Sequence, residues 1–312
     1  MNHTDDISRL AFPEDYNDFI PPFSDFGFKN LFGKGDKSKE NLIFLLNEVL
    51  KEYPGMNPIV DVVYKNVEQQ AENPVRKSSR FDIYCKTDRG ETFVVEMQND
   101  RDPLLRNRLV FYLCLAVTEQ DSRINPEVPW DYSFPPVIAI MFCNFIDKEI
   151  DPCEVNYFGI LNRKTFQPFG NHVGLVIVQL PLFPKQENEC KTELQRIIYS
   201  LENMETIQRT GKIPFSTQKG DFYDRIAWMS RKAALTDEEL HAYNQWLKVT
   251  NDDRLRELRA EAKGREEGRE EGREQGQKSM QLKIARNLLS SGMSPEEVAN
   301  NTGLSISDLK NL

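Results

Sequence analysis

The sequence predicts an α/β fold, a mixed sheet flanked by helices with a helical C-terminal extension. Three observations lead to this prediction. Amphipathic helical segments and β-branched segments follow one another in the order helix, three strands, helix, strand. The segment 136–143 is almost entirely apolar, as expected of a central strand that is buried on both faces. From Cys190 onward the apolar residues repeat with a helical period.

Local patterns justify each element in turn. Apolar residues at i, i+3 and i+4 near residue 30 predict a short helix that ends at Gly33. Ser38 is suited to N-cap an amphipathic helix over 39–52. Asp102 and Pro103 predict the start of a helix that runs to about residue 120. Period-two alternation and apolar runs predict strands at 59–67, 80–86, 92–98, 136–143, 154–161 and 172–180.

Composition excludes several classes of protein. The 312 residues carry a formal net charge of −9, so any contact with nucleic acid needs local basic patches rather than a basic surface overall. The 5 cysteines have no CxxC spacing and the 3 histidines have no paired spacing, so neither a disulfide scaffold nor a zinc site is expected. We find no secretory leader and no membrane-spanning run, and we therefore expect a cytoplasmic protein.

The composition changes after residue 251. Gly264, Gly268, Gly272 and Gly276 recur within a Gly-Arg-Glu-Glu repeat, and each glycine costs a helix about 1 kcal/mol relative to alanine. Two interpretations remain open, a solvated and partly helical linker or a helical stalk through which two copies associate. The domains that we expect are a first domain over 1–205, a helical extension over 206–250, the repeat over 251–278, and a small helical hairpin over 279–312.

The last segment has the pattern of a helix-turn-helix. Gly292 and Gly303 mark two helix ends, and Ser294, Pro295 and Glu297 form a capping box between them. Acidic and basic residues balance over 279–312, so a protein-contact or structural role and a DNA-reading role both remain open.

The segment 80–98 carries most of the functional information. Asp88, Arg89 and Gly90 fit a three-residue hairpin loop in which the glycine takes the positive φ. This loop places Thr87 opposite Glu91. Counting outward along the two strands from that pair places Asp82 opposite Glu96. Alternation then divides the side chains into two faces. One face holds Phe81, Ile83, Cys85, Phe93, Val95 and Met97, and the other holds Arg80, Asp82, Lys86, Glu96 and Gln98.

Two facing carboxylates are unfavourable on their own. Opposed Cβ atoms lie about 5 Å apart, and two negative charges at that distance repel by roughly 3 kcal/mol at an effective dielectric near 20. A divalent cation between them reverses the sign, and the hard oxygen ligands suit Mg²⁺, with Mn²⁺ as a substitute. The alternative is that Arg80 and Lys86 neutralise the acids on a solvated strand face.

These residues resemble a known family. Asp82, followed fourteen positions later by Glu96-Met97-Gln98, is similar to the PD-(D/E)XK nuclease pattern in its E-x-Q variant. Within that superfamily the chain resembles the Rpn-type recombination-promoting nuclease/transposase family. The supporting segments are 25–33 (DFGFKNLFG), 46–50 (LNEVL), Lys77, 94–98 (VVEMQ), Arg108, Tyr112, Gln120, and a Glu/Gly repeat before 302–305 (TGLS). The hairpin motif alone is moderately specific, whereas the ordered set is much more so.

The resemblance implies a PD-(D/E)XK restriction-endonuclease-like core and a Mg²⁺-dependent DNA endonuclease. It assigns metal binding to Asp82 and Glu96, with the Met97 backbone carbonyl as a further ligand. Gln98 stands where most of the superfamily has lysine, and its amide orients water but carries no ammonium charge. This departure from the family's pattern leaves more of the activation to the metal and argues against high turnover. Asp25 is a candidate additional acid, or alternatively a partner of its helix dipole.

DNA binding also requires cations near the acids. The candidates that flank the motifs are Lys29, Lys34, Lys37, Arg76, Lys77, Arg80, Arg101, Arg106 and Arg108, with Tyr112 one turn beyond the last of them. For Arg108 and Tyr112, a phosphate contact and a buried Arg–carboxylate pair with a packed tyrosine both remain open.

Two functions follow. The first is a metal-dependent DNA endonuclease that hydrolyses phosphodiester bonds in recombination, mobile elements or defence. The second is a nuclease fold with a weak active site that binds DNA or protein through its C-terminal helices. The opposed acids favour the first.

Overall fold

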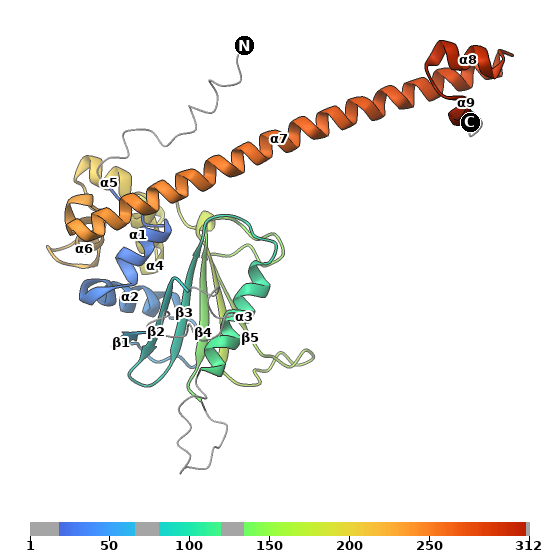
Figure 1. Ribbon diagram of the computed structural model, residues 1–312. Coiled ribbons are helices and arrows are strands. Elements are labelled where there is room, and N and C mark those ends of the chain that lie inside the picture. The colour runs from blue at the N-terminus through green and yellow to red at the C-terminus, as the bar shows by residue number, and fades with distance from the viewer. Residues whose placement is uncertain (1–18, 66–80, 120–133, 310–312) are drawn as a thin grey trace. The chain divides into compact units, whose positions relative to one another are not determined.

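The computed structural model describes residues 19–65, 81–119 and 134–309, and its centre is a six-stranded mixed sheet (Figure 1). The strand order is β1-β2-β3-β4-β6-β5. Strands β3, β4 and β6 are parallel, whereas β1, β2 and β5 pair antiparallel with their neighbours. The strands are β1 (Val62–Tyr64), β2 (Ile83–Thr87), β3 (Thr92–Gln98), β4 (Val137–Cys143), β5 (Val155–Gly159) and β6 (Val173–Gln179). The predicted α/β class with a mixed sheet is confirmed.

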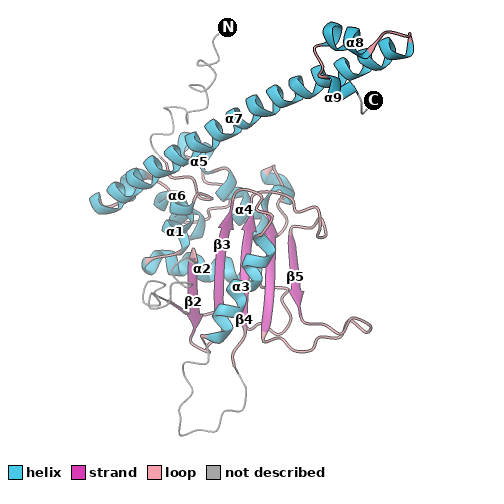
Figure 2. Cartoon of the chain, turned by 45° about the vertical axis from the view of Figure 1, so that its right-hand side comes forward, coloured by secondary structure: helices cyan, strands magenta, loops and turns pink. Residues whose placement is uncertain are grey.

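Helices cover the two faces of the sheet unequally. On one face the strands share a core with α1 (Asp25–Phe32), α2 (Gly35–Val49), α4 (Glu193–Glu202), α5 (Met204–Thr210) and α6 (Phe222–Met229). On the other face, within the described residues, the strands pack against one helix, α3 (Leu105–Thr118), which crosses in front of the strands in Figure 2. Because both faces are covered at the centre, all seven residues of β4 are buried, as the apolar run predicts.

Two predicted helix starts are wrong. Helix α2 begins at Gly35, so Ser38 lies inside it, where its buried hydroxyl donates to the Asn30 carbonyl oxygen at 2.8 Å. Helix α3 begins at Leu105, after a turn in which the Asp102 carboxylate accepts a hydrogen bond from the Leu104 amide at 2.8 Å. In both cases the polar side chain that the sequence suggests as a helix cap forms a hydrogen bond with a backbone group outside that helix.

The Gly-Arg-Glu repeat is helical throughout. Helix α7 (Asp237–Ser290) has 54 residues and includes the repeat without a break. Exposed pairs one turn apart support it, such as Lys263–Glu267 at 3.5 Å. A Cβ atom at any of the four repeat glycines would meet nothing within 4 Å.

The C-terminal helices have a small core of their own. Helix α8 (Pro295–Thr302) begins with the predicted capping box and ends at Gly303, which adopts φ 72°. Helix α9 (Ile306–Leu309) follows. The core consists of Ala285, Val298, Leu304 and Leu309. By its contacts the chain divides into two units, 1–243 and 244–312. None of the helices in the described part of the chain is long and apolar enough to span a membrane.

Candidate active site

The β2–β3 hairpin has the register that its sequence predicts. Tyr84 pairs with Val94 and Lys86 pairs with Thr92. The Thr87 amide donates to the Glu91 carbonyl oxygen at 2.9 Å and closes the turn. Gly90 has φ 96°, the left-handed conformation that the three-residue loop requires. The turn chemistry and the alternation of side chains therefore fix the pairing together.

This register brings Asp82 and Glu96 into contact. The Asp82 amide donates to Glu96 Oε1 at 3.3 Å, and the Met97 amide donates to Asp82 Oδ2 at 2.9 Å. Asp82 lies one residue before β2, and Glu96 lies near the end of β3. Both are shielded from solvent, with a side-chain exposure of 10% for Asp82 and a residue exposure of 6% for Glu96. The two acids thus share one side of the hairpin end.

Burial and mutual repulsion perturb these acids. Burial, and then the negative charge of Asp82, raise the pKa of Glu96 to about 8. Burial and the same Asp82 charge raise the pKa of Asp25. The Lys29 ammonium, which lies 3.0 Å from Asp82 Oδ1, opposes both shifts, and Arg108 opposes that of Glu96. The pKa of Glu96 nevertheless remains raised, so its surroundings favour the neutral form of this carboxyl group.

The cation that meets Asp82 comes from α1, not from the hairpin. Lys29 extends from α1, and the Asn99 amide group ties the end of β3 to the Phe23 carbonyl oxygen ahead of α1 at 2.8 Å. A Cβ atom at Gly27 would lie 2.0 Å from the Pro21 carbonyl oxygen, so only glycine allows this entry into α1. Sequence reasoning missed this ion pair because the partners are 53 positions apart.

The strand face that carries the acids is not solvated. Tyr84 and Val94 on that face are buried under α3, so the alternative of acids on an open strand face is wrong. Phe81 is a second correction, because it packs with this cluster, its ring centroid 4.9 Å from that of Tyr112. Strict alternation would place it on the opposite face, but β2 begins only at Ile83.

Gln98 is held by Arg108. The Arg108 guanidinium donates to the Gln98 side-chain oxygen and to Asp102 Oδ2, the latter at 2.9 Å. The Gln98 amide nitrogen donates to the Asp100 carbonyl oxygen at 2.9 Å. The buried Nε atom of Arg108 has no partner within the described residues. Arg108 therefore forms a carboxylate pair, as one of its two interpretations states, and presents an unused donor beside the acids.

Tyr112 and Asp25 also belong to this region. Burial, and then the charge of Glu96, raise the pKa of Tyr112, which packs against Phe81. Asp25 occupies the first turn of α1, directly after the N-cap Ser24, whose hydroxyl accepts from the Gly27 amide at 3.0 Å. Asp25 is thus both a dipole partner and a neighbour of Asp82, so its two interpretations are compatible.

Other predicted cations have partners within the protein. Arg106 donates to Asp147 and Glu149 at 2.7 Å each, and Lys34 contacts Glu239 at 2.8 Å. The Arg101 guanidinium donates to the Ile146 carbonyl oxygen at 2.8 Å, and the Lys37 ammonium lies 4.1 Å from the ring centroid of Trp228. Lys77, Arg80, Arg76 and Gln120 lie outside the described residues.

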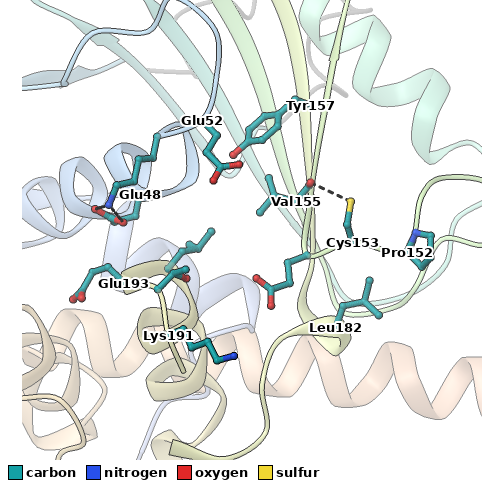
Figure 3. Close-up of a pocket in the computed structure, with 13 residues that line it drawn as sticks. Glu48, Glu52, Pro152, Cys153, Val155, Tyr157, Leu182, Lys191 and Glu193 are labelled. Carbon is teal, nitrogen blue, oxygen red and sulfur yellow. Dashed lines mark hydrogen bonds and ion pairs between the residues drawn. The ribbon is translucent and has the colours of Figure 1, made fainter. Parts of the chain in front are cut away.

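The acids do not form a larger cluster of metal-binding side chains. Across residues 19–65, 81–119 and 134–309, no group of three or more His, Cys, Asp or Glu is arranged to hold a metal ion. A cavity of about 940 Å³ lies elsewhere, between α2, β5 and the start of α4 (Figure 3). It is lined by Glu48, Glu52, Tyr157 and Glu193 among others and contains neither Asp82 nor Glu96.

Comparison with known families identifies the chain. Residues 22–258 match the PD-(D/E)XK nuclease family transposase, and residues 278–312 match the C-terminal HTH domain of the Rpn/YhgA-like nuclease family. Searches of the curated proteins and of the solved structures gave no match. The first match covers well over half of the chain and includes the β2–β3 hairpin with its acids. The protein therefore belongs to the PD-(D/E)XK nuclease family of transposases and carries an Rpn-type C-terminal helix-turn-helix domain.

Proposed function

We propose that this protein is a metal-dependent DNA endonuclease that hydrolyses phosphodiester bonds in recombination, mobile-element or defence processes. The observation that carries the proposal is the Asp82–Glu96 pair, joined through the Asp82 backbone amide, in which the burial of Glu96 and repulsion from Asp82 raise the pKa of Glu96 to about 8. A buried carboxylate beside a second acid is unfavourable unless a proton or a cation neutralises the pair, and this cost supports a cation site at the hairpin end.

The residues present fit a magnesium ion. An ammonium, that of Lys29, already lies 3.0 Å from Asp82, so the site attracts positive charge. Asp82, Glu96 and the Met97 backbone carbonyl would hold the ion, and two carboxylates suffice because Mg²⁺ keeps several of its waters. When bound, such an ion supplies an acidified water and neutralises charge on the phosphate. Mn²⁺ suits the same oxygen ligands.

The protein's own side chains have separate tasks in this proposal. Gln98 orients a water through its amide, and Arg108 fixes that amide and places a positive charge where the superfamily pattern has lysine. Lys29, 44% exposed, moves from Asp82 to a DNA phosphate when DNA binds. Tyr112 supports Phe81 beneath the acids, and Asp25 contributes further negative charge. Lys77 and Arg80 remain predicted DNA contacts.

DNA is the substrate that the two family matches support together. A nuclease domain and a helix-turn-helix domain occur on one chain, and helix-turn-helix units present a helix to the major groove. Each of the five cysteines is unpaired, which agrees with the reducing cytoplasm that we expect for this protein.

Plasmid nicking tests the proposal. We expect Mg²⁺-dependent nicking by the full chain and a loss of at least 100-fold in Asp82→Asn and in Glu96→Gln, with folding checked by circular dichroism. Asp88→Asn is the matched control, because Asp88 is an exposed acid of the same hairpin. Nicking that survives both site substitutions, or that ignores EDTA, contradicts the proposal.

One observation favours the second function, a binding module with a weak active site. Gln98 lacks the ammonium of the superfamily lysine, so the chemistry has one fewer source of charge stabilisation. DNA retention without nicking, lost when residues 279–312 are deleted, would establish this second function in place of the first.

We also propose that the repeat of α7 is a stalk through which two copies associate. The open glycine stripe leaves room for a second helix to approach closely. Light scattering on the full chain and on a form lacking 251–278 tests this, and equal mass per particle in the two forms contradicts it.

A further inference from the structure

An arm that exposes two phenylalanine side chains projects from the edge of the sheet. Residues 160–172 connect β5 to β6 and extend away from the strands as a narrow loop (Figure 1). Leu161 bridges Pro168, and the Asn162 amide donates to the Gln167 carbonyl oxygen at 2.9 Å, so the arm is an ordered hairpin. Phe166 is 73% exposed and Phe169 is 87% exposed. Neither phenylalanine ring is buried against the residues that the structure describes, and rings this open to water mark a contact site.

The backbone at Phe166 strengthens this point. Phe166 has φ 57°, a left-handed conformation that glycine and asparagine adopt readily and that bulky residues rarely adopt. The turn itself would therefore be more stable with asparagine at this position. Among the described residues no burial of the Phe166 ring compensates for this backbone conformation, which favours a contact with another molecule.

An apolar cavity lies beside the base of the arm. Its volume is about 510 Å³, and it is bounded by Val110, Cys114 and Val117 of α3 and by Phe158, Ile160 and Leu175 of the sheet edge. A dry cavity of about 150 Å³ already holds a benzene ring, so this one has room for two phenyl rings. Ile160 accepts a hydrogen bond from the Phe169 amide at 2.9 Å, which places the arm directly beside the cavity.

We propose that the cavity receives the phenylalanines of the arm of a second copy of this chain, and that two copies exchange arms. A two-fold axis requires one surface to carry both halves of the contact, and here the projecting rings and the cavity adjoin each other. The two rings would bury about 300 Å² per copy, at roughly 200 Å² for each fully exposed aromatic side chain. The apolar cavity walls add to this, but the sum stays below the roughly 800 Å² per partner of a stable interface, so we expect the two copies to associate weakly.

DNA is the less suitable occupant. Val173, the first residue of β6, lies in register with Val137 and through it with Thr92, the first residue of β3. The arm therefore leaves the sheet at the end opposite to Glu96 and Gln98. Arg163 and Lys164 at the arm tip would lie at the polar rim of the protein contact. The proposal involves neither acid and is independent of the nuclease function.

Disulfide trapping tests the arrangement directly. Cys114 is an exposed cysteine that lines the cavity, so Phe166→Cys in the full chain should give an oxidation-dependent dimer on a non-reducing gel. The dimer should disappear when Cys114→Ser is added. Lys212→Cys, an exposed position elsewhere on the nuclease unit, is the matched control and should not cross-link. No cross-link, a cross-link that persists in Cys114→Ser, or a disulfide within one chain would each overturn the proposal.

A double variant measures the affinity between two copies without disturbing the fold. Phe166→Asn combined with Phe169→Thr removes both rings at exposed positions, and asparagine tolerates the left-handed turn. We expect this variant to remain folded and to associate at least tenfold more weakly than the parent by sedimentation. Both proteins are compared in a form lacking 251–278, and again as full chains, so that association through α7 is separated. An unchanged dissociation constant in both comparisons overturns the proposal.

Discussion

Replacing Glu96 by glutamine should remove a pH-dependent weakness of the metal-free fold. The Glu96 carboxyl group has a pKa of about 8 in the folded chain and an ordinary value of 4.5, because burial and then Asp82 disfavour its charge. The folded state therefore binds one more proton than the unfolded state between these values. This group's contribution to stability is complete below pH 4.5 and is lost as the pH rises through 8.

The magnitude follows from the two pKa values. Between pH 6 and pH 8 the carboxyl group loses about 2 kcal/mol of its contribution to the free energy of unfolding. Glutamine keeps a similar shape and cannot ionise, so Glu96→Gln should lack this part of the slope and should exceed the wild type most clearly at high pH.

Urea unfolding at both pH values in EDTA measures the effect. The wild type should lose about 2 kcal/mol more than Glu96→Gln over this interval. Glu52→Gln, an exposed position of the same unit, serves as the control and should keep the wild-type slope. Parallel pH dependence in the wild type and in Glu96→Gln would show that Glu96 is not held neutral by its surroundings, and the electrostatic argument for a cation site would fail.

Three further outcomes are expected. Arg108→Lys keeps the positive charge but loses the planar guanidinium that holds the Gln98 side chain. The kcat for plasmid nicking should therefore fall about tenfold with little change in the urea midpoint, and an unchanged kcat would contradict the positioning role. Gly268→Ala should raise the helicity of α7 by circular dichroism, by up to about 1 kcal/mol of helix stability, and should weaken association through α7 because the added methyl group hinders close approach of a second helix; unchanged association would contradict the stalk. Val298 is fully buried in a core of a few residues, so Val298→Ala should lower the stability of the C-terminal helices by about 2 kcal/mol. Hydrogen-exchange protection should then be lost in α8 and α9 but kept in residues 19–243, and retained protection in α8 would refute this.

Local patterns were sufficient to predict the hairpin. The β3 strand spans 92–98 as predicted, because a turn that needs glycine at position 90 and an alternating apolar face select the same register. The central strand β4 could be predicted equally well, because a strand that is buried on both faces has an uninterrupted run of apolar residues. The contact between Asp82 and Glu96 followed from that register alone.

Long-range contacts account for what the sequence did not reveal. Lys29 was predicted as a DNA contact, but nothing near it in the sequence indicates that it lies against Asp82. The sequence around Ser38 is typical of a helix cap, but in the structure the Ser38 hydroxyl donates to the Asn30 carbonyl oxygen. Arg106 and Lys34 were expected at a basic rim, yet acids from distant segments pair with them. Each of these partners is set by tertiary packing, which residue spacing does not encode.

The tight entry into α1 links a distant backbone position to the electrostatic balance of the hairpin. At Gly27 even a single methyl group would meet the Pro21 carbonyl oxygen at 2.0 Å, so the first turn of α1 would have to shift. That turn carries Asp25, and Lys29 follows one turn later. A change as small as alanine at position 27 would therefore alter the charges around Asp82 without replacing any acid, so the electrostatics of the hairpin end depend on a backbone position in a separate helix.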